Sequence, residues 1–331
     1  MKTKVLITGG AGYIGSHVAH QMIEGGFDIT ILDNLSTGHR WAVPDGAKFV
    51  QMELGEEASV REFLQREKFD ALIHFAASIQ VGESVSKPEL YYRNNTMNTL
   101  RLFEAAKASG IKSIVFSSTA AVYGELHSGL LKETDRLRPI NPYGWSKFMS
   151  EQILCDLAAA SNGALKYVIL RYFNVAGARP DLKIGQSGAV VTHLIKIASQ
   201  AAVGLRDGMQ IFGTDYATAD GTCERDYIHV EDLSRAHLDA LSYLSKGGQS
   251  DVFNVGYGHA TSVRTVIDTV KRVSGVNFKV TEGARRAGDP AMLAADSTKI
   301  RKALGWEPRF DDLDEICRTA FEWEKKLRSK G

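Results

Sequence analysis

Lys4-Val-Leu-Ile-Thr-Gly-Gly-Ala-Gly-Tyr-Ile-Gly15 is the segment from which the fold of this chain can be predicted. Its apolar run Val5–Ile7 is suited to a strand that is buried on both faces. Gly9, Gly12 and Gly15 follow at three-residue intervals, and the apolar residues after them recur at helical spacing. A strand, a glycine turn and a helix in this order bind the pyrophosphate of a dinucleotide at the helix N-terminus.

A second expected strand supports this interpretation and specifies the cofactor. Asp28-Ile-Thr-Ile-Leu32 leads into Asp33, close to the position at which dinucleotide-binding units carry an acidic residue. A carboxylate there can accept hydrogen bonds from both hydroxyls of the adenine ribose and repels a 2′-phosphate. We therefore predict NAD rather than NADP as the cofactor.

Length and composition limit the class of protein. The 331 residues are 44% hydrophobic, enough for one large or two moderate domains with a substantial core. The net charge of +1 gives no electrostatic reason to expect nucleic acid or a membrane surface as a partner, and no apolar run reaches transmembrane length. The three cysteines, Cys155, Cys223 and Cys317, are far apart, so we expect no metal site, no disulfide framework and a cytoplasmic location.

Short apolar runs alternate with helical patterns through the first half of the chain. This alternation predicts an α/β fold, a Rossmann-type doubly wound parallel sheet with helices on both faces. The expected strands are Lys4–Thr8, Asp28–Asp33, Lys48–Met52, Ala71–Phe75, Ser113–Ser117 and Tyr167–Arg171. The expected helices lie near Gly12–Glu24, Ser59–Glu67, Pro88–Ser109 and Pro142–Ala160. Two of them are long, and because such helices often pair with copies from a second subunit, we expect a homodimer.

After Asn174 the alternation gives way to loops and separate helices. We expect an NAD-binding domain over 1–173 and a smaller mixed α/β domain over 174–331 that binds the substrate. The strand predicted at Asp251–Val255 is expected to return to the first domain, within a segment near 227–257. Further helices are expected near Val190–Val203, Val230–Leu244, Ser262–Ser274 and Asp311–Leu327.

The candidate catalytic residues are Thr119, Tyr143 and Lys147. Tyr143 and Lys147 are four residues apart, on one face of a helix that Pro142 can begin, and Thr119 follows an expected strand. A nearby ammonium and the positive nicotinamide ring of an oxidised cofactor both favour a phenolate, so we expect Tyr143 to act as a general base. Thr119 can hydrogen-bond the same substrate hydroxyl. A lone Tyr-x-x-x-Lys pair is common on amphipathic helices, but the dinucleotide unit and the Ser-Ser-Thr strand end favour catalysis here.

Motifs along nearly the whole chain together resemble the extended short-chain dehydrogenase/reductases and, among them, the UDP-glucose 4-epimerases. The motifs are Thr8-Gly-Gly-Ala-Gly-Tyr-Ile-Gly-Ser-His17, Leu32-Asp-Asn-Leu35, His74-Phe-Ala-Ala77, Val81-Gly-Glu-Ser84, Tyr91-Tyr-Arg-Asn-Asn95, Phe116-Ser-Ser-Thr119, Val122-Tyr-Gly124, Pro142-Tyr-Gly-Trp-Ser-Lys147, Leu170-Arg-Tyr-Phe-Asn174, Arg225-Asp-Tyr-Ile-His-Val230 and Arg285-Arg-Ala-Gly-Asp289.

The resemblance implies the residues that contact NAD. They are Gly9, Gly12, Tyr13, Ile14, Gly15, Asp33, Asn34, Ser36, Thr37, Gly38, Glu53, Leu54, Phe75, Ala76, Ala77, Ile79, Asn94, Ser117, Tyr143, Lys147, Tyr172 and Phe173. Two of them depart from the family pattern: Glu53 stands where Asp is common, and Ile79 stands where many members carry Lys, which removes one phosphate contact.

The resemblance also implies a UDP-sugar substrate and the residues that bind it. They are Thr119, Tyr143, Asn174, His193, Leu194, Gln210, Phe212, Arg225, Arg286, Asp289 and Leu293. Arginine suits this role because its planar fork grips phosphate oxygens bidentately. His193 stands where some members have Asn, so we assign it no proton transfer, and His74 is expected to be a hydrogen-bonded core residue. The position of Leu293 varies in size among epimerases and lies beside carbon 2 of the sugar.

The implied activity is UDP-glucose/UDP-galactose 4-epimerase, by transient oxidation to a 4-keto sugar that turns and is reduced on its other face. Alternatives are 4-epimerisation of the N-acetylated pair or another UDP-sugar, a nucleotide-sugar dehydratase, and a dinucleotide-sensing protein without catalysis. The family's dehydratases carry carboxylates where this chain has Ala120 and Ala121. Sensing relatives typically lose the Tyr/Lys pair, which this chain retains.

Overall fold

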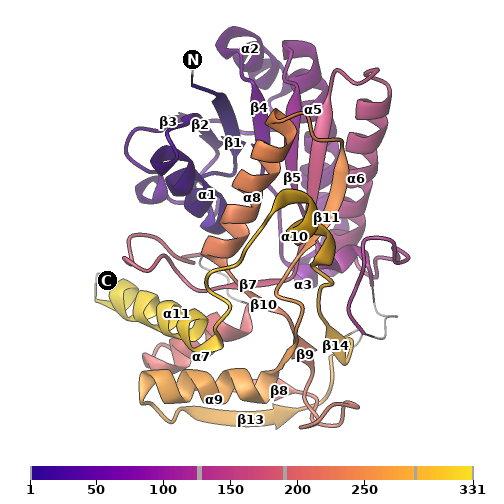
Figure 1. Ribbon diagram of the computed structural model, residues 1–331. Coiled ribbons are helices and arrows are strands. Elements are labelled where there is room, and N and C mark those ends of the chain that lie inside the picture. Colours follow the sequence, from indigo (N-terminus) through magenta and orange to yellow (C-terminus); the bar gives the residue numbers. More distant parts are fainter. Residues whose placement is uncertain (1, 125–128, 189–191, 287–288, 330–331) are drawn as a thin grey trace.

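A seven-stranded parallel sheet forms the larger part of the protein (Figure 1). The computed structural model describes residues 2–124, 129–188, 192–286 and 289–329. The strand order is β11-β6-β5-β4-β1-β2-β3, in which the chain runs outward in both directions from β1 and β4. The strands are β1 (Lys4–Thr8), β2 (Asp28–Asp33), β3 (Lys48–Gln51), β4 (Ala71–His74), β5 (Ser113–Thr119), β6 (Lys166–Tyr172) and β11 (Asp251–Val255).

Helices cover both faces of this sheet, because successive side chains of each buried strand point to opposite sides. Ile7 of β1 packs in one cluster with Val18 of α1 (Tyr13–Glu24) and Leu233 of α8 (Val230–Ser245). Leu6, its neighbour, packs in the other cluster with residues of α2 (Glu57–Glu67), α5 (Asn98–Ser109) and α6 (Pro142–Ala159). The predicted doubly wound α/β fold is confirmed.

The helix expected over Pro88–Ser109 is present over that range, but its hydrogen-bond repeat changes at the centre. It consists of α4 (Pro88–Tyr91), the π-helical segment η2 (Tyr92–Met97) and α5, preceded by α3 (Val81–Ser86). Within the π-helical segment, the Asn95 amide accepts from Ser78 N at 2.8 Å and donates to Ser146 Oγ at 3.0 Å. These contacts come from the loop after β4 and from α6, so tertiary structure overrides the regular helical repeat here.

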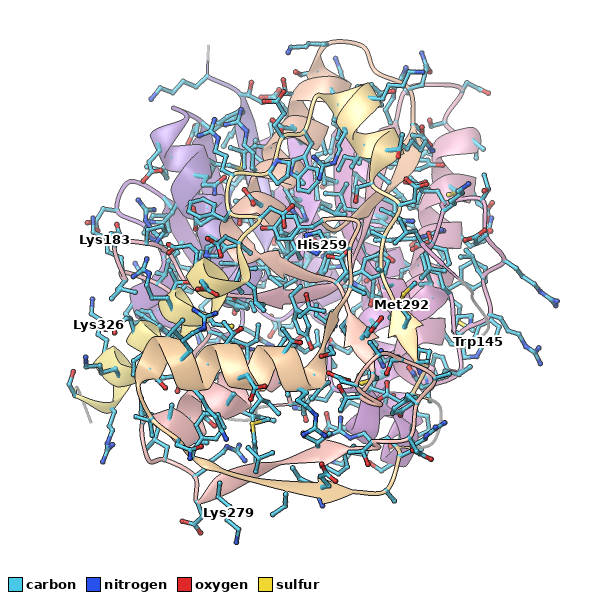
Figure 2. The ribbon with its side chains drawn as sticks, turned by 60° about the horizontal axis from the view of Figure 1, so that its bottom comes forward. Trp145, Lys183, His259, Lys279, Met292 and Lys326 are labelled. Carbon is cyan, nitrogen blue, oxygen red and sulfur yellow. The ribbon has the colours of Figure 1, made fainter. Side chains whose placement is uncertain are left out.

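The remaining elements form a second region at the other end of the molecule (Figure 1). Its helices are α7 (Leu194–Ala202), α9 (Val263–Ser274) and α11 (Leu313–Arg328), and α10 (Thr298–Leu304) lies near β11. Val190 and Val191, where α7 was expected to begin, lie outside the described residues. Small ladders complete the region: β7 (Asn174–Ala176) with β10 (Tyr227–His229), β8 (Gly208–Phe212) with β13 (Lys279–Gly283), and β9 (Glu224–Arg225) with β12 (Thr261–Ser262) and β14 (Met292–Leu293). Figure 2 shows Lys279 of β13 at the outer edge of this region.

The buried carboxylate of Asp226 joins the second region to the end of β11. Its Oδ1 accepts from Tyr257 N at 2.9 Å, and its Oδ2 accepts from Gly258 N at 3.0 Å and Ala295 N at 3.2 Å. The side chain is fully buried, and burial raises the pKa of Asp226 while the three backbone donors oppose that rise. One side chain therefore satisfies backbone donors from two separate segments.

Asp226→Ala is expected to lower the free energy of unfolding by about 2–3 kcal/mol, because it leaves buried backbone N–H groups without acceptors. Urea unfolding followed by circular dichroism measures this loss. Asp268→Ala, at an exposed position on α9, is the matched control and should change stability by less than about 0.5 kcal/mol. Equal stabilities for the two variants would contradict the role given to Asp226.

Candidate active site

The glycine turn after β1 is shaped by close backbone approach. Gly9 has a φ of 72°, and a Cβ on it would lie 2.6 Å from Ala76 N, while a Cβ on Gly15 would collide with the carbonyl oxygen of Gly9. Gly12 is different, because the nearest atom to its Cβ position is 3.2 Å away. Gly12 precedes the first residue of α1 and has no side chain to cap the N–H groups there. The turn therefore fits the pyrophosphate of NAD, which those N–H groups can bind.

Asp33, at the end of β2, holds this turn and still has acceptor capacity. It is 7% exposed, its Oδ2 accepts from Ala11 N at 3.0 Å and its Oδ1 accepts from Leu35 N at 2.8 Å. Each carboxylate oxygen has a second lone pair available for a ribose hydroxyl. Beside it, Asn34 Nδ2 donates to Glu53 Oε2 at 2.6 Å. These residues fit the adenosine half of NAD.

Ser117, His237 and Tyr172 form a hydrogen-bonded group at the carboxyl edge of the sheet, between β4 and β6. Ser117 Oγ lies 2.7 Å from Nε2 of His237 on α8, and Ser117 also hydrogen-bonds Tyr172. Burial lowers the pKa of His237 to about 4, so the ring is neutral at pH 7. Its Nδ1 lies 2.9 Å from the Leu233 carbonyl, to which it donates, and Nε2 therefore accepts from Ser117. The Phe75 ring packs 4.7 Å from the His237 ring.

Tyr143 reaches Thr119 because the start of α6 is fixed. Asn141 caps the helix, its Oδ1 accepting from Gly144 N at 2.8 Å, and a Cβ on Gly144 would lie 2.8 Å from the Ala121 carbonyl oxygen. The helix therefore lies close to the segment that follows β5, η3 (Ala120–Val122). Tyr143 and Thr119 are each 9% exposed and hydrogen-bond one another through their hydroxyls. The structure thus brings these two predicted catalytic residues together.

The surroundings of Tyr143 in the protein by itself oppose the phenolate, and the expected effect of a bound oxidised nicotinamide stays a prediction. Burial raises the pKa of Tyr143, and the hydrogen bond from Thr119 opposes this rise. Lys147 is 4% exposed, with its Nζ 4.4 Å from the centre of the Phe116 ring. Burial lowers the pKa of Lys147 to about 7, against the opposing charge of Glu151. Desolvation disfavours both charged forms, so a phenolate at Tyr143 needs nearby positive charge, which the Lys147 ammonium and an oxidised nicotinamide can both supply.

The predicted substrate residues of the second region form a cationic group. Arg225 of β9 is ion-paired with Asp289 and donates to the Glu224 carbonyl at 2.7 Å. The guanidinium of Arg286 lies 3.9 Å from the centre of the Phe212 ring on β8, the strand that also carries Gln210. Ala287 and Gly288, which stand between Arg286 and Asp289 in the sequence, lie outside the described residues. Two arginines held by neighbours in this way can grip a diphosphate.

Leu293 lies between this cationic group and the catalytic residues. In β14 it pairs with Arg225 of β9, and its side chain packs against a buried cluster that includes Ala120 and Phe173. Ala120 directly follows Thr119, and Phe173 directly follows β6. A residue at this position can therefore wall a sugar held between the arginines and Tyr143.

The other predicted site residues lie at or just beyond the carboxyl ends of the sheet strands, or at the start of the second region. After β1 lie Tyr13 and Ile14; after β2, Ser36, Thr37 and Gly38; after β3, Leu54; after β4, Ala76, Ala77 and Ile79; in η2, Asn94; and in the second region Asn174, His193 and Leu194. Several also have structural partners: Tyr13 donates to the Gly177 carbonyl at 2.6 Å, Asn94 Nδ2 donates to Ser78 Oγ at 2.9 Å, and Leu54 joins a buried cluster. Ile79 points outward with 57% exposure.

Two histidines are occupied by hydrogen bonds. His193, before α7, lies 2.9 Å through Nδ1 from Gln186 Nε2, and burial lowers its pKa. His74 is bonded at both ring nitrogens, to Thr8 Oγ1 at 2.6 Å and Thr99 Oγ1 at 2.9 Å, and burial lowers its pKa to about 3. His74 is thus the hydrogen-bonded core residue that was predicted.

One group beneath the site was not predicted from the sequence. Glu151 accepts hydrogen bonds from Ser118 and Arg171, and all three side chains are buried. Glu151 follows Lys147 by four residues, so the helical spacing alone could have indicated it. Arg171 comes from β6, and only the fold brings it to Glu151.

Within the described ranges, no group of three or more His, Cys, Asp and Glu residues could hold a metal ion. None of the helices in these ranges is both long and apolar enough to cross a membrane.

Comparisons with known proteins agree with this geometry. Residues 5–256 match the NAD dependent epimerase/dehydratase family. A UDP-glucose 4-epimerase of Azospirillum brasilense is 51% identical over 324 residues, 98% of this chain and 92% of that protein. The solved structure of the UDP-Glc/GlcNAc 4-epimerase from Campylobacter jejuni is similar with a TM-score of 0.87 and 52% identity, covering 98% of this chain and 99% of that one. The solved structure of UDP-glucose 4-epimerase from Brucella ovis in complex with NAD is similar with a TM-score of 0.93 and 42% identity, covering 97% of this chain and 98% of that one. With a family match that runs from β1 through β11 and relatives that align over almost its whole length, the chain belongs to the NAD dependent epimerase/dehydratase family.

Proposed function

We propose that the protein is a UDP-glucose/UDP-galactose 4-epimerase that retains NAD through the catalytic cycle. The observation that carries the proposal is the hydrogen bond between the hydroxyls of Thr119 and Tyr143 at the carboxyl edge of a dinucleotide-binding sheet. The printed names of the Azospirillum and Brucella relatives support it. The division into a domain over 1–173, rejoined near 227–257, and a substrate domain over 174–331 remains a prediction.

Each group in the site has a role in this reaction. When bound, NAD⁺ accepts a hydride from carbon 4 of the sugar and returns it to the opposite face. Tyr143 takes the proton of the 4-hydroxyl and gives it back, and Thr119 holds that oxygen by a hydrogen bond. Lys147 supplies the positive charge beside the phenolate. Arg225 and Arg286 hold the diphosphate while the 4-keto sugar turns about its linkage.

A dehydratase fits the site less well. Elimination of water needs a further acid/base pair, and the candidate positions after Thr119 are Ala120 and Ala121 in η3. Neither methyl group can transfer a proton. A sensing protein without catalysis has no need of Tyr143 and Lys147, yet both are retained and buried at the sheet edge, although burying polar and charged groups is unfavourable.

The direct test is incubation of the purified protein with UDP-galactose and no added NAD. We expect UDP-glucose to form, and denaturation to release NAD(H) into the supernatant, because hydride must be kept between the two half-reactions. Chromatography of the products and of the released nucleotide measures both. A protein without dinucleotide that works only with added NADP would overturn the proposal.

Tyr143→Phe is expected to lower turnover at least roughly 10²-fold, the scale of a positioned acid/base group, with little change in substrate binding. The substitution keeps the ring and removes only the oxygen that transfers the proton. Steady-state kinetics and equilibrium binding of UDP measure the two effects. Tyr243→Phe, whose hydroxyl accepts from Gln249 N on the surface, is the matched control. Near-normal turnover of Tyr143→Phe would remove this residue from the mechanism.

Leu293 is proposed to set the choice of sugar, with a primary UDP-galactose/UDP-glucose activity and some tolerance for N-acetyl groups. Leu293→Tyr should suppress turnover of UDP-N-acetylgalactosamine and leave UDP-galactose turnover largely intact, because a ring there crowds carbon 2. Kinetics with both substrates measure the ratio. The steric explanation fails if both activities fall in equal proportion. It also fails if the unchanged protein has no N-acetyl activity and Leu293→Gly does not create it.

A homodimer in a reducing, cytoplasmic compartment is part of the same proposal. Apolar side chains are exposed on neighbouring helical segments: Leu90 of α4, Met97 of η2, and Trp145 and Met149 of α6. Figure 2 shows Trp145 at the outer surface. These helical segments pack against one another, and exposed apolar side chains on adjoining helices favour burial against a second copy. The three cysteines are free thiols, in keeping with a reducing compartment.

A further inference from the structure

Next to the site lies a buried group of opposite charges, formed by Lys147, Glu151 and Arg171. Lys147 and Glu151 stand one turn apart on α6, and Arg171 of β6 is ion-paired with Glu151. Arg171 Nη2 donates to Glu151 Oε2 at 2.7 Å, and its Nε donates to both carboxylate oxygens, at 3.1 and 3.2 Å. The three residues are between 3% and 4% exposed. Charges so far from water interact strongly.

Glu151 is also fixed from the sheet side. Ser118, which precedes Thr119 in β5, donates its hydroxyl to Glu151 Oε1. Arg171 Nη1 in turn contacts the Tyr123 hydroxyl at 3.1 Å, and that hydroxyl donates to Asn254 Oδ1 at 2.6 Å. The chain of contacts therefore runs from the strand end that carries Thr119, through α6, to β6 and β11. Glu151, Ser118 and Arg171 have no part in the proton transfer assigned above.

We propose that Glu151, pinned by Ser118 and Arg171, is a positioning residue that keeps the Lys147 ammonium charged and in place beside Tyr143. Arg171 remains charged whatever its surroundings. Without the carboxylate between them, two buried cations would repel each other, and Lys147 would lose its proton first. This role deepens the epimerase proposal, on which it rests.

The other titratable groups around Lys147 do not supply this charge. His74 of β4 is neutral, since burial and the Lys147 charge lower its pKa to about 3. Tyr91 of α4 donates to Glu83, and burial with that carboxylate raises its pKa to about 12. Burial raises the pKa of Tyr123 to about 12 against the charge of Arg171. Glu151 is the charged group that raises the pKa of Lys147.

The test compares Glu151→Gln with Arg171→Gln, two changes that should act in opposite directions. Loss of the anion lowers the pKa of Lys147, so the ammonium is lost at lower pH and the alkaline limb of the kcat profile moves down by roughly one pH unit. At a pH within that window kcat falls roughly tenfold, while KM for UDP-galactose is unchanged. Loss of the Arg171 cation instead leaves the Glu151 carboxylate without its cationic partner, so its charge acts more strongly on Lys147. The alkaline limb then moves to higher pH.

Two further measurements separate this role from a structural one. Ultraviolet titration of the NAD-loaded protein, with the spectrum of Tyr143→Phe subtracted, should show the Tyr143 phenolate forming at higher pH in Glu151→Gln. The double variant Glu151→Gln/Arg171→Gln removes both charges and should bring the alkaline limb part of the way back toward its original position. A merely structural pair predicts that the double variant is no better than either single one.

Asp156→Asn, on the exposed face of the same helix, is the matched control and should leave the profile unchanged. The inference is overturned if Glu151→Gln folds, retains NAD and keeps the original pH profile, or if both single variants shift it in the same direction. If Glu151→Gln does not fold, the test rests on Arg171→Gln alone. The inference is then overturned if the alkaline limb of the kcat profile of Arg171→Gln does not move to higher pH. An unmodified protein without epimerase activity would instead refute the proposed function, which separates the two failures.

Discussion

Parallel pairing of β1 with β4 and of β5 with its two neighbours is the constraint on which the rest of this structure depends. Parallel strands end at one common edge, so their following loops meet there. The glycine turn, Phe75, Thr119 and Tyr172 come together for this reason, although long stretches of sequence separate them. The helices on both faces bury the sheet and leave this edge as the place where polar groups can gather.

The second consequence of this arrangement is electrostatic. Lys147 and Arg171 are cations inside the protein, and a buried carboxylate stands between them. Isolated buried charges cost several kcal/mol each, so such a row is stable only when each member is paired and hydrogen-bonded. The same low exposure raises the pKa of Tyr143, which makes its phenolate dependent on a nearby positive charge. Binding of an oxidised cofactor and activation of the base are thereby linked.

Along the sequence, the polypeptide crosses several times between the sheet and the second region. These crossings place the functional groups of the two regions relative to one another. Arg225 and Asp226 are neighbours in sequence but serve different purposes: the arginine forms the cationic group with Asp289, whereas the aspartate binds three backbone donors. Because Asp226 anchors the backbone next to Arg225, this arginine can hold a diphosphate at a defined place relative to Tyr143 while the sugar itself remains free to turn.

Local patterns in the sequence determined the glycine turn, the order of strands and helices along the chain, and the shared helical face of Tyr143 and Lys147, because strand and helix repeats and turn chemistry act over a few residues. The tertiary structure alone decided the rest. The π-helical segment exists because Asn95 bonds Ser78 and Ser146, and two-residue strands such as β9 carry no periodicity to detect. Whether Tyr143 favours its charged or neutral form depends on burial, and the partner of Glu151 comes from another strand. Contacts between distant segments set solvation and pairing, and no local pattern records them.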